Sequence, residues 1–259
     1  MLLNFDEERL VNYCAWLVIA TGVVSIISGY FLATPYGRYS REGWGFGIDA
    51  RLAWFLQESP SFIIPCSLLW FNDGRMVLMS LQPNTAVLSM FLIHYFRRSF
   101  IYPLWIKNTA STPFFIFLSA FFFCSLNGYM QGQYHLYLAH YPEDWFQSYQ
   151  FIFGCLIFLS GFAMNLYFDY IITNLRKPGE TGHKIPRGGL FEYVSCPNFF
   201  GEIVEWGGYA LASSSFVAFA FFFNTFIQLG VRAFYHHRFY HKKFEDYPKN
   251  RKAVIPFVF

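Results

Sequence analysis

Several polar residues that could do chemistry lie inside apolar runs of this sequence, at spacings that put them on one helix face. Asn165 and Asp169 are separated by one helical turn. Asn198, Glu202 and Glu205 follow the same pattern in a later apolar run. Ionisable groups are costly in such surroundings and usually mark a functional site. We therefore expect these side chains to line one polar cavity.

Glu58 and Tyr95 are expected at the same depth on two different helices. Glu58 follows Arg51 by about two helical turns, or ~10 Å, and Tyr95 precedes Tyr102 by about the same distance. Both helices are expected to reach the same surface at Arg51 and Tyr102. The two side chains are therefore candidates for one site.

Basic side chains gather toward the same side: Arg97, Arg98, Arg176, Arg232 and His236. The opposite half of the apolar runs is nearly free of charge. This arrangement predicts a cavity that opens to one side and is lined with acids, amides and bases over an apolar floor. It suits a large polar cofactor beside an apolar substrate, but a methyl donor or a transporter fits these residues equally well. The sequence has no GxGxxG after a strand, so any dinucleotide would be held without a Rossmann fold.

Each of these residues also has a simpler explanation. The alternative for Glu58 is a pairing with an arginine, which its place beside Pro60 and Pro65 in a distorted helix disfavours, and the alternative for Tyr95 is a place among interfacial aromatic residues. Asp169 and Arg176 have the spacing of a structural ion pair. His237 and His241 share a helix face, but no acid or cysteine completes a ligand set, so we expect no metal site.

The composition says which kind of element must position these groups. The chain has 259 residues, of which 55% are apolar, 14% charged and 23% aromatic, with 35 Phe. A soluble domain carries about twice this fraction of charge. The high aromatic content excludes a disordered chain. Five cysteines in a chain of this length do not support a module built on disulfides. A net charge of +3 does not favour a protein that binds nucleic acid. What remains is an integral membrane protein.

The apolar runs predict an all-α bundle of seven transmembrane helices in one membrane domain, residues 1–259. Five runs are long enough to span a bilayer: 10–33, 52–71, 77–102, 113–132 and 149–172. With the N-terminus outside, nearly all Lys and Arg of the connecting segments fall inside. The segment from Arg232 is basic as well and belongs inside, which requires an even number of crossings between Pro197 and Val231. We therefore predict a hairpin of two helices around 213–215 and a cytosolic C-terminus.

Long motifs point to a known family. The segments AWFLQESPSF (53–62), FLIHYFRRSFIYP (91–103), NGYMQGQY (127–134), LRKPGETGHKIPRGGLFEYVSCPNFFGEIVEWGGYALAS (175–213) and RAFYHHRFYHKKFEDYPKNRKAVIPF (232–257) resemble the steroid 5α-reductases, or 3-oxo-5α-steroid 4-dehydrogenases. The resemblance covers nearly the whole chain. QESP and HYFRR favour the steroid branch over related polyprenol and enoyl-CoA reductases, which share parts of the C-terminal block.

The resemblance implies a seven-helix membrane enzyme that uses NADPH to reduce the Δ4 double bond of 3-oxo-Δ4-steroids such as testosterone or progesterone. Glu58 and Tyr95 would hold the steroid C3 carbonyl, and Trp54 would line the steroid pocket. Hydride would go to C5 while donors at the carbonyl oxygen stabilise the charge that develops there. Residues 1–135 would mainly bind steroid, and residues 136–259 would mainly bind NADPH.

Cofactor contacts carry over from the family's motifs to ten positions: Arg98, Asn165, Asp169, Arg176, Lys184, Asn198, Glu202, Arg232, His236 and Tyr240. At 183–184 the chain has His-Lys where the family more usually has Tyr-Arg, which affects the phosphate contact expected of Lys184.

Other functions remain open from the sequence. The same fold also serves reductases of polyprenols, enoyl-CoA or other lipid enones, and the C-terminal layout is similar to that of membrane methyltransferases of the isoprenylcysteine type. A lipid-binding or transport bundle without enzyme activity is a further alternative. The expected partners are a steroid from the bilayer and the lipid membrane, with no nucleic acid and no obligate protein. Endoplasmic reticulum and bacterial inner membrane fit equally.

Overall fold

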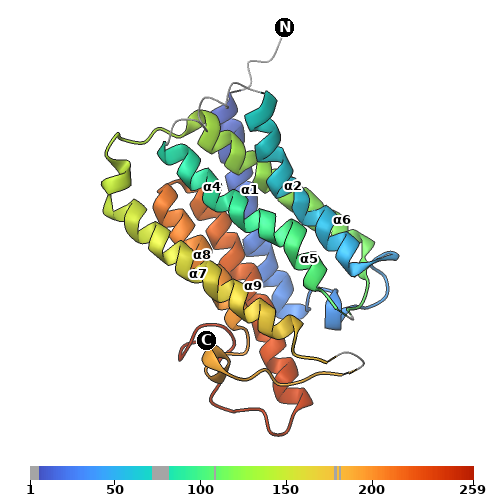
Figure 1. The fold of residues 1–259 in the computed structure, drawn as a ribbon. Helices are drawn as coiled ribbons and strands as arrows, with labels where there is room; N and C mark the ends of the chain where they lie inside the picture. The colour runs from blue at the N-terminus through green and yellow to red at the C-terminus, as the bar shows by residue number, and fades with distance from the viewer. Residues whose placement is uncertain (1–5, 72–81, 108, 178–179, 181) are drawn as a thin grey trace.

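The computed structural model describes residues 6–71, 82–107, 109–177, 180 and 182–259, and most of them are helical. The long helices of these residues are α1 Glu7–Phe31, α2 Ala50–Phe71, α4 Pro83–Phe96, α6 Phe114–Gln133, α7 Tyr149–Thr173, α8 Pro197–Ser213 and α9 Phe216–Lys243. Figure 1 shows them side by side in one bundle, with successive helices running in opposite directions. The predicted helical bundle is therefore confirmed.

Short elements connect the long helices. Two π-helical turns, η2 Arg97–Ile101 and η3 Tyr134–Leu138, extend α4 into α5 (Tyr102–Trp105) and lengthen α6. The remaining short elements are η1 Gly37–Tyr39, η4 Trp145–Gln147, η5 Gly189–Glu192, β1 Gly47–Ile48 and β2 Thr112–Pro113. The two strands pair antiparallel and depart from the all-α prediction, because two-residue strands are too short to leave an alternating pattern in a sequence.

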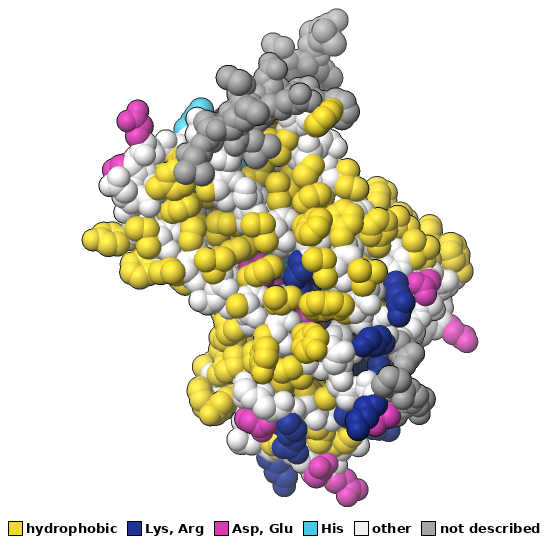
Figure 2. Space-filling model, in the orientation of Figure 1, with side chains coloured by type: hydrophobic (Ala, Val, Ile, Leu, Met, Phe, Trp, Pro, Cys, Tyr) yellow, Lys and Arg dark blue, Asp and Glu magenta, His cyan; other side chains and the backbone are white. Residues whose placement is uncertain are grey.

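The surface of the bundle fits a membrane protein. Within the described residues, four helices qualify by length and composition as membrane spans: Glu7–Phe31, Phe114–Leu138, Tyr149–Thr173 and Phe216–Lys243. Figure 2 shows hydrophobic side chains over most of the upper part of one face, with Lys and Arg gathered on its lower part. The seven-span count and the orientation stay predictions, and the start of the span predicted at 77–102 lies outside the described residues.

The predicted hairpin between 197 and 231 is present. Helix α8 ends at Ser213, and Ser214 takes a left-handed conformation with φ 46°. Ser215 then caps α9 by accepting a hydrogen bond from the backbone N–H of Ala218 at 3.1 Å. The basic segment from Arg232 begins within this second helix, because α9 continues to Lys243.

Glycines bring α7 and α8 into close contact. A Cβ on Gly161 would lie 2.6 Å from the carbonyl oxygen of Gly201, and a Cβ on Gly201 would lie 3.0 Å from the carbonyl oxygen of Gly161. Small residues of this kind let two membrane helices approach each other closely. The contact sets the polar face of α7 directly against the polar face of α8.

Two glycines of α6 likewise allow close contact with two prolines of α2. A Cβ on Gly128 would lie 2.7 Å from the carbonyl oxygen of Pro60, and one on Gly132 would lie 3.1 Å from the Cα of Pro65. Both prolines lie inside α2. This contact holds the α2 turn that carries Glu58 against α6.

Candidate active site

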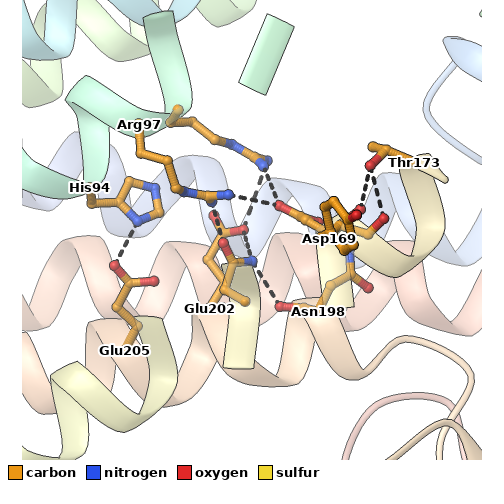
Figure 3. Close-up of polar contacts among 10 residues, drawn as sticks. His94, Arg97, Asp169, Thr173, Asn198, Glu202 and Glu205 are labelled. Carbon is orange, nitrogen blue, oxygen red and sulfur yellow. Dashed lines mark hydrogen bonds and ion pairs between the residues drawn. The ribbon is translucent and has the colours of Figure 1, made fainter. Parts of the chain in front are cut away.

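A buried network of charged and amide side chains joins α4–η2, α7 and α8 (Figure 3). The Arg97 guanidinium lies 3.1 Å from Asp169 Oδ2, and Arg98 lies 3.6 Å from the same oxygen. Arg98 also lies 3.8 Å from Glu202 Oε2. Asn198 donates to Asp169 Oδ1 at 3.0 Å. Two arginines thus face two carboxylates inside the bundle, where unpaired charges would be very costly.

Asn165 ties the three elements of this network together. Its Oδ1 accepts a short hydrogen bond from Arg97. Its Nδ2 donates to the Asn198 carbonyl at 3.0 Å and to Glu202 Oε2 at 3.3 Å. The side chain is fully buried. Asn165 therefore fixes the arginines and acids rather than facing open space.

The π-helical turn η2 explains how consecutive arginines serve one site. It begins at Arg97, directly after the α4 turn that carries Tyr95. A π-helical turn inserts an extra residue into the helix and is frequent at functional sites. Arg97 and Arg98 both reach Asp169, although neighbouring residues on a regular α-helix diverge.

A pocket of about 540 Å³ opens beside this network. Of the described residues that line it, the basic ones are Arg38, Arg98, Arg176, Lys184 and Arg232, whereas the acidic one is Asp169. Trp54, Asn198, His236 and Tyr240 line it as well. The pocket is therefore strongly cationic, with aromatic walls.

The segment after α1 forms one wall of this pocket. The Arg232 guanidinium lies 3.5 Å from the centre of the Tyr36 ring. Tyr39 stacks on His236, and its hydroxyl forms a 3.0 Å hydrogen bond with His236 Nδ1. Burial raises the pKa of Tyr39 to about 12, so the phenol keeps its proton at neutral pH. The wall is thus a preformed cationic and aromatic surface.

Glu58 and Tyr95 meet the same stretch of α6. The Cys124 thiol lies 3.7 Å from Glu58 Oε2, and Asn127 Nδ2 lies 3.4 Å from the Tyr95 hydroxyl. Cys124 and Asn127 are one helical turn apart on α6. The structure therefore brings the two predicted carbonyl-binding residues to one level of the bundle.

Trp54 and Arg98 connect this pair with the cationic pocket. Trp54 lies one turn before Glu58 on α2 and lines the pocket. The Arg98 guanidinium lies 4.7 Å from the centre of its ring. The indole Nε1 is buried and has no hydrogen-bond partner among the described residues. A buried donor without a partner at this junction fits a site that awaits a ligand.

The predicted cofactor residues fall into three groups. Arg98, Asp169, Asn198, Arg232, His236 and Tyr240 line the inner pocket, as the resemblance implies. Asn165 and Glu202 are not in the pocket lining and support it from behind. Arg176 and Lys184 lie at its exposed rim, where Arg176 donates to the Lys107 carbonyl at 3.5 Å and Lys184 pairs with Glu180. Asp169 pairs with Arg97 and Arg98, which makes the simpler pairing with Arg176 wrong.

Sequence reasoning missed two contributors to this region, His94 and Arg38. His94 Nδ1 forms a buried pair with Glu205 Oε1 at 2.7 Å, and Arg38 lines the pocket. Arg97, which was expected among the basic groups of the cavity, is only 3% exposed. The i, i+3 spacing of His94 and Arg97 was the available signal for His94, since it places both on the side of α4–η2 that meets α7 and α8.

Comparison with known proteins identifies the relatives of this chain. A family model described as 3-oxo-5-alpha-steroid 4-dehydrogenase matches residues 110–259. The chain is 46% identical over 256 residues to 3-oxo-5-alpha-steroid 4-dehydrogenase 1 of Bos taurus, covering 99% of this chain and 100% of that protein. It is 50% identical over 212 residues to 3-oxo-5-alpha-steroid 4-dehydrogenase 2 of Rattus norvegicus, covering 82% of each.

The human proteins give the same result. Identity is 45% over 247 residues to 3-oxo-5-alpha-steroid 4-dehydrogenase 2 of Homo sapiens, covering 93% of this chain and 94% of that protein. Such identity over nearly the full length confirms the predicted family and its enzyme class, the oxidoreductases that act on a CH–CH group. The chain belongs to the 3-oxo-5-alpha-steroid 4-dehydrogenase family.

Proposed function

We propose that this protein reduces the Δ4 double bond of a 3-oxo-Δ4-steroid to the 5α-reduced 3-oxo-steroid, with NADPH as the reductant. The observation that carries the proposal is the junction at Trp54 and Arg98, where a cationic pocket adjoins the Glu58–Tyr95 level. A polar reductant and an apolar substrate must meet at such a junction. The names of the relatives support the substrate class.

The pocket fits an anionic dinucleotide. Its basic lining complements phosphate groups, and arginine suits them well because its planar fork of donors matches phosphate oxygens. Tyr36 and Tyr39 hold Arg232 and His236 in place before any ligand arrives. The residues proposed to hold the cofactor are Arg98, Asn165, Asp169, Arg176, Lys184, Asn198, Glu202, Arg232, His236 and Tyr240.

Glu58 and Tyr95 would act on the substrate carbonyl. An enone accepts a hydride at its β carbon only when the charge that builds up on the carbonyl oxygen is stabilised, and two donors aimed at that oxygen do so. Glu58 donates only as the neutral acid, because a carboxylate would repel the developing charge. Its oxygens contact the Gln57 amide at 3.4 Å and the Cys124 thiol at 3.7 Å, both of them weak neutral contacts.

When bound, NADPH would supply a hydride for C5 of the steroid, and a proton would complete the reduction at C4. The chain's own contribution is to orient the substrate and polarise its carbonyl. Orientation in a closed site is worth several kcal/mol of activation free energy, on the order of 7 or more in favourable cases. The surrounding aromatic core, which includes Phe91, Trp206 and Phe221, excludes water from the Tyr95 level.

The test uses the purified full chain in lipid nanodiscs. We expect it to consume NADPH and form the 5α-reduced product from testosterone or progesterone, with one NADPH used per product. The control substrate is the same steroid with ring A already saturated, which should consume none. Reduction of an enoyl-CoA or a polyprenol without reduction of the steroid would show that the fold serves another lipid substrate, and transfer of a methyl group would overturn the proposal altogether.

A further inference from the structure

A continuous chain of buried hydrogen bonds leads from Tyr95 into the half of the bundle away from the cationic pocket. Its members are Tyr95, Asn127, Gln131, Tyr209 and His135, and each has an exposed fraction of 4% or less. Asn127, Gln131 and His135 lie one turn apart on α6 and η3. Resting on the proposed function, we infer that this chain positions the Tyr95 proton for donation to the substrate carbonyl.

The direction of the chain is fixed at Gln131. Its Nε2 lies 3.3 Å from the backbone carbonyl oxygen of Val217, a group that can only accept. The amide nitrogen must therefore face Val217 and Asn127, and it donates to Asn127 Oδ1 at 3.4 Å. The Gln131 carbonyl oxygen is left facing the Tyr209 hydroxyl, which donates to it at 2.8 Å.

The consequence at the far end concerns the tautomer of His135. Tyr209 has a single hydroxyl proton and has given it to Gln131. The 3.0 Å contact between the Tyr209 oxygen and His135 Nε2 must then be donated by the imidazole. His135 Nδ1 is buried without a partner among the described residues. The ring is therefore the neutral tautomer that carries its proton on Nε2.

The consequence at the near end concerns Tyr95. Since Asn127 Oδ1 accepts from Gln131, Asn127 Nδ2 donates to the Tyr95 oxygen at 3.4 Å. Tyr95 accepts this bond and keeps its own proton for another acceptor. Ser61, its neighbour on α2, gives its proton to the Cys124 carbonyl at 3.0 Å, so toward Tyr95 its oxygen acts as an acceptor and not as a donor. These links thus leave the Tyr95 proton free for an acceptor, and the substrate carbonyl oxygen would take that place.

A double-mutant cycle separates this positioning role from simple packing. Tyr209→Phe and Gln131→Met should each lower the single-turnover rate about tenfold, as expected for the loss of an orienting hydrogen bond, and should leave the KM for NADPH unchanged. In a Tyr95→Phe background the same two changes should cost nothing further, because there is no longer a proton to orient. Equal losses in both backgrounds would overturn the inference.

Tyr141→Phe is the matched control. Tyr141 also donates a hydrogen bond inside the bundle, to the Ser213 carbonyl at 2.9 Å, but it is no member of the chain. Its effect should be the same with and without the Tyr95 hydroxyl. If Tyr141→Phe loses its effect in the Tyr95→Phe background as the chain variants do, the cycle does not report positioning and the inference fails.

A second measurement does not depend on the substrate. In protein labelled with ¹⁵N-histidine, the resonances lost in His135→Gln should be those of a neutral ring protonated on Nε2. A ring protonated on Nδ1, or a charged ring, would overturn the chain whatever the activity. Wild-type protein that shows the expected tautomer but reduces no 3-oxo-Δ4-steroid would refute the proposed function alone.

Discussion

At the scale of single residues, the site separates charge from neutral donors. Arg97 and Arg98 face Asp169 and Glu202 in the α4–α7–α8 network, so these charges are compensated within the protein. The hydrogen-bond partners of Glu58 among the described residues, Gln57 and Cys124, are neutral, and the Arg98 charge acts on it without a hydrogen bond. This difference is the reason to assign Glu58, and not the network acids, to the substrate carbonyl.

Substitutions at Glu58 test that assignment. Glu58→Gln keeps a donor of similar shape and should retain part of the turnover, whereas Glu58→Ala should reduce the single-turnover rate roughly 10²–10³-fold, as for the loss of one oxyanion donor. Tyr95→Phe should change the rate in the same direction. The measurement is NADPH oxidation at saturating 3-oxo-Δ4-steroid. Near-normal turnover by the alanine variant together with an inactive glutamine variant would exclude Glu58 as the carbonyl donor.

Arg176 gives a prediction at the rim of the pocket. Its side chain lines the pocket but makes only a 3.5 Å contact with the Lys107 carbonyl, so the fold depends on it little. Arg176→Ala should therefore raise the KM for NADPH severalfold and leave the KM for steroid nearly unchanged. Arg187→Ala, at an exposed position absent from the pocket lining, is the control. Equal KM values for NADPH in both variants would remove Arg176 from the cofactor site.

The sequence predicts which site residues share one helix face, but not which residues pair between two helices. Spacing along one helix placed Asn165 with Asp169, and Asn198 with Glu202, because a helical face follows from the period alone. It did not show that Arg97 rather than Arg176 pairs with Asp169, since this depends on the π-helical turn and on how α4 is rotated against α7. The donor and acceptor order of the hydrogen-bond chain through Gln131 could not be predicted either, because it depends on where the Val217 carbonyl lies on another helix.

At the scale of elements, the approach of α7 to α8 holds the network together. Gly161→Ala would push a methyl group into the backbone of α8 and should destabilise the protein by about 1–3 kcal/mol through overpacking. Gly230→Ala on α9 is the matched control, because an added Cβ there meets nothing within 4 Å. Thermal unfolding followed by helical circular dichroism measures both. A Gly161→Ala protein as stable as the control would show that the close contact is not needed.

The same scale shows which elements a sequence can reveal. The basic character of the segment from Arg232 required an even number of crossings, and the hairpin between Ser213 and Phe216 agrees with that requirement. The extension of α9 to Lys243 was not expected. Two of its basic residues, Arg232 and His236, lie one turn apart and line the pocket, as their expected place in the cavity required.

At the scale of the whole molecule, positive charge is distributed unequally along the bundle. Much of the Lys and Arg on the face in Figure 2 lies on its lower part, where Figure 1 places the C-terminal segment. Arg232, His236 and Tyr240, near the C-terminal end of α9, line the pocket. From the positive-inside rule we propose that this end faces the cytosol, where a soluble cofactor would have access. This orientation suits both the endoplasmic reticulum and a bacterial inner membrane.

Tags at the two ends of the chain test the proposed topology of seven spans. In sealed vesicles or intact cells, the C-terminal tag should be accessible only from the cytosolic side and the N-terminal tag only from the opposite side. The control is a membrane protein in the same membranes whose terminal segment is known to be cytosolic, because its accessibility from the other side would show that the membranes are not sealed. Both tags on one side would require an even number of spans and contradict the topology.

The central claim is that the cationic pocket and the Glu58–Tyr95 level act together in one reduction. NADPH deuterated at both C4 positions of the nicotinamide tests this most directly when the wild-type protein converts a 3-oxo-Δ4-steroid in ordinary water. The account predicts a 5α product that carries one deuterium, at C5, and a proton from solvent exchange at C4. Product without deuterium at C5, or deuterium lost to water, would contradict direct transfer between the two parts of the site and with it this account.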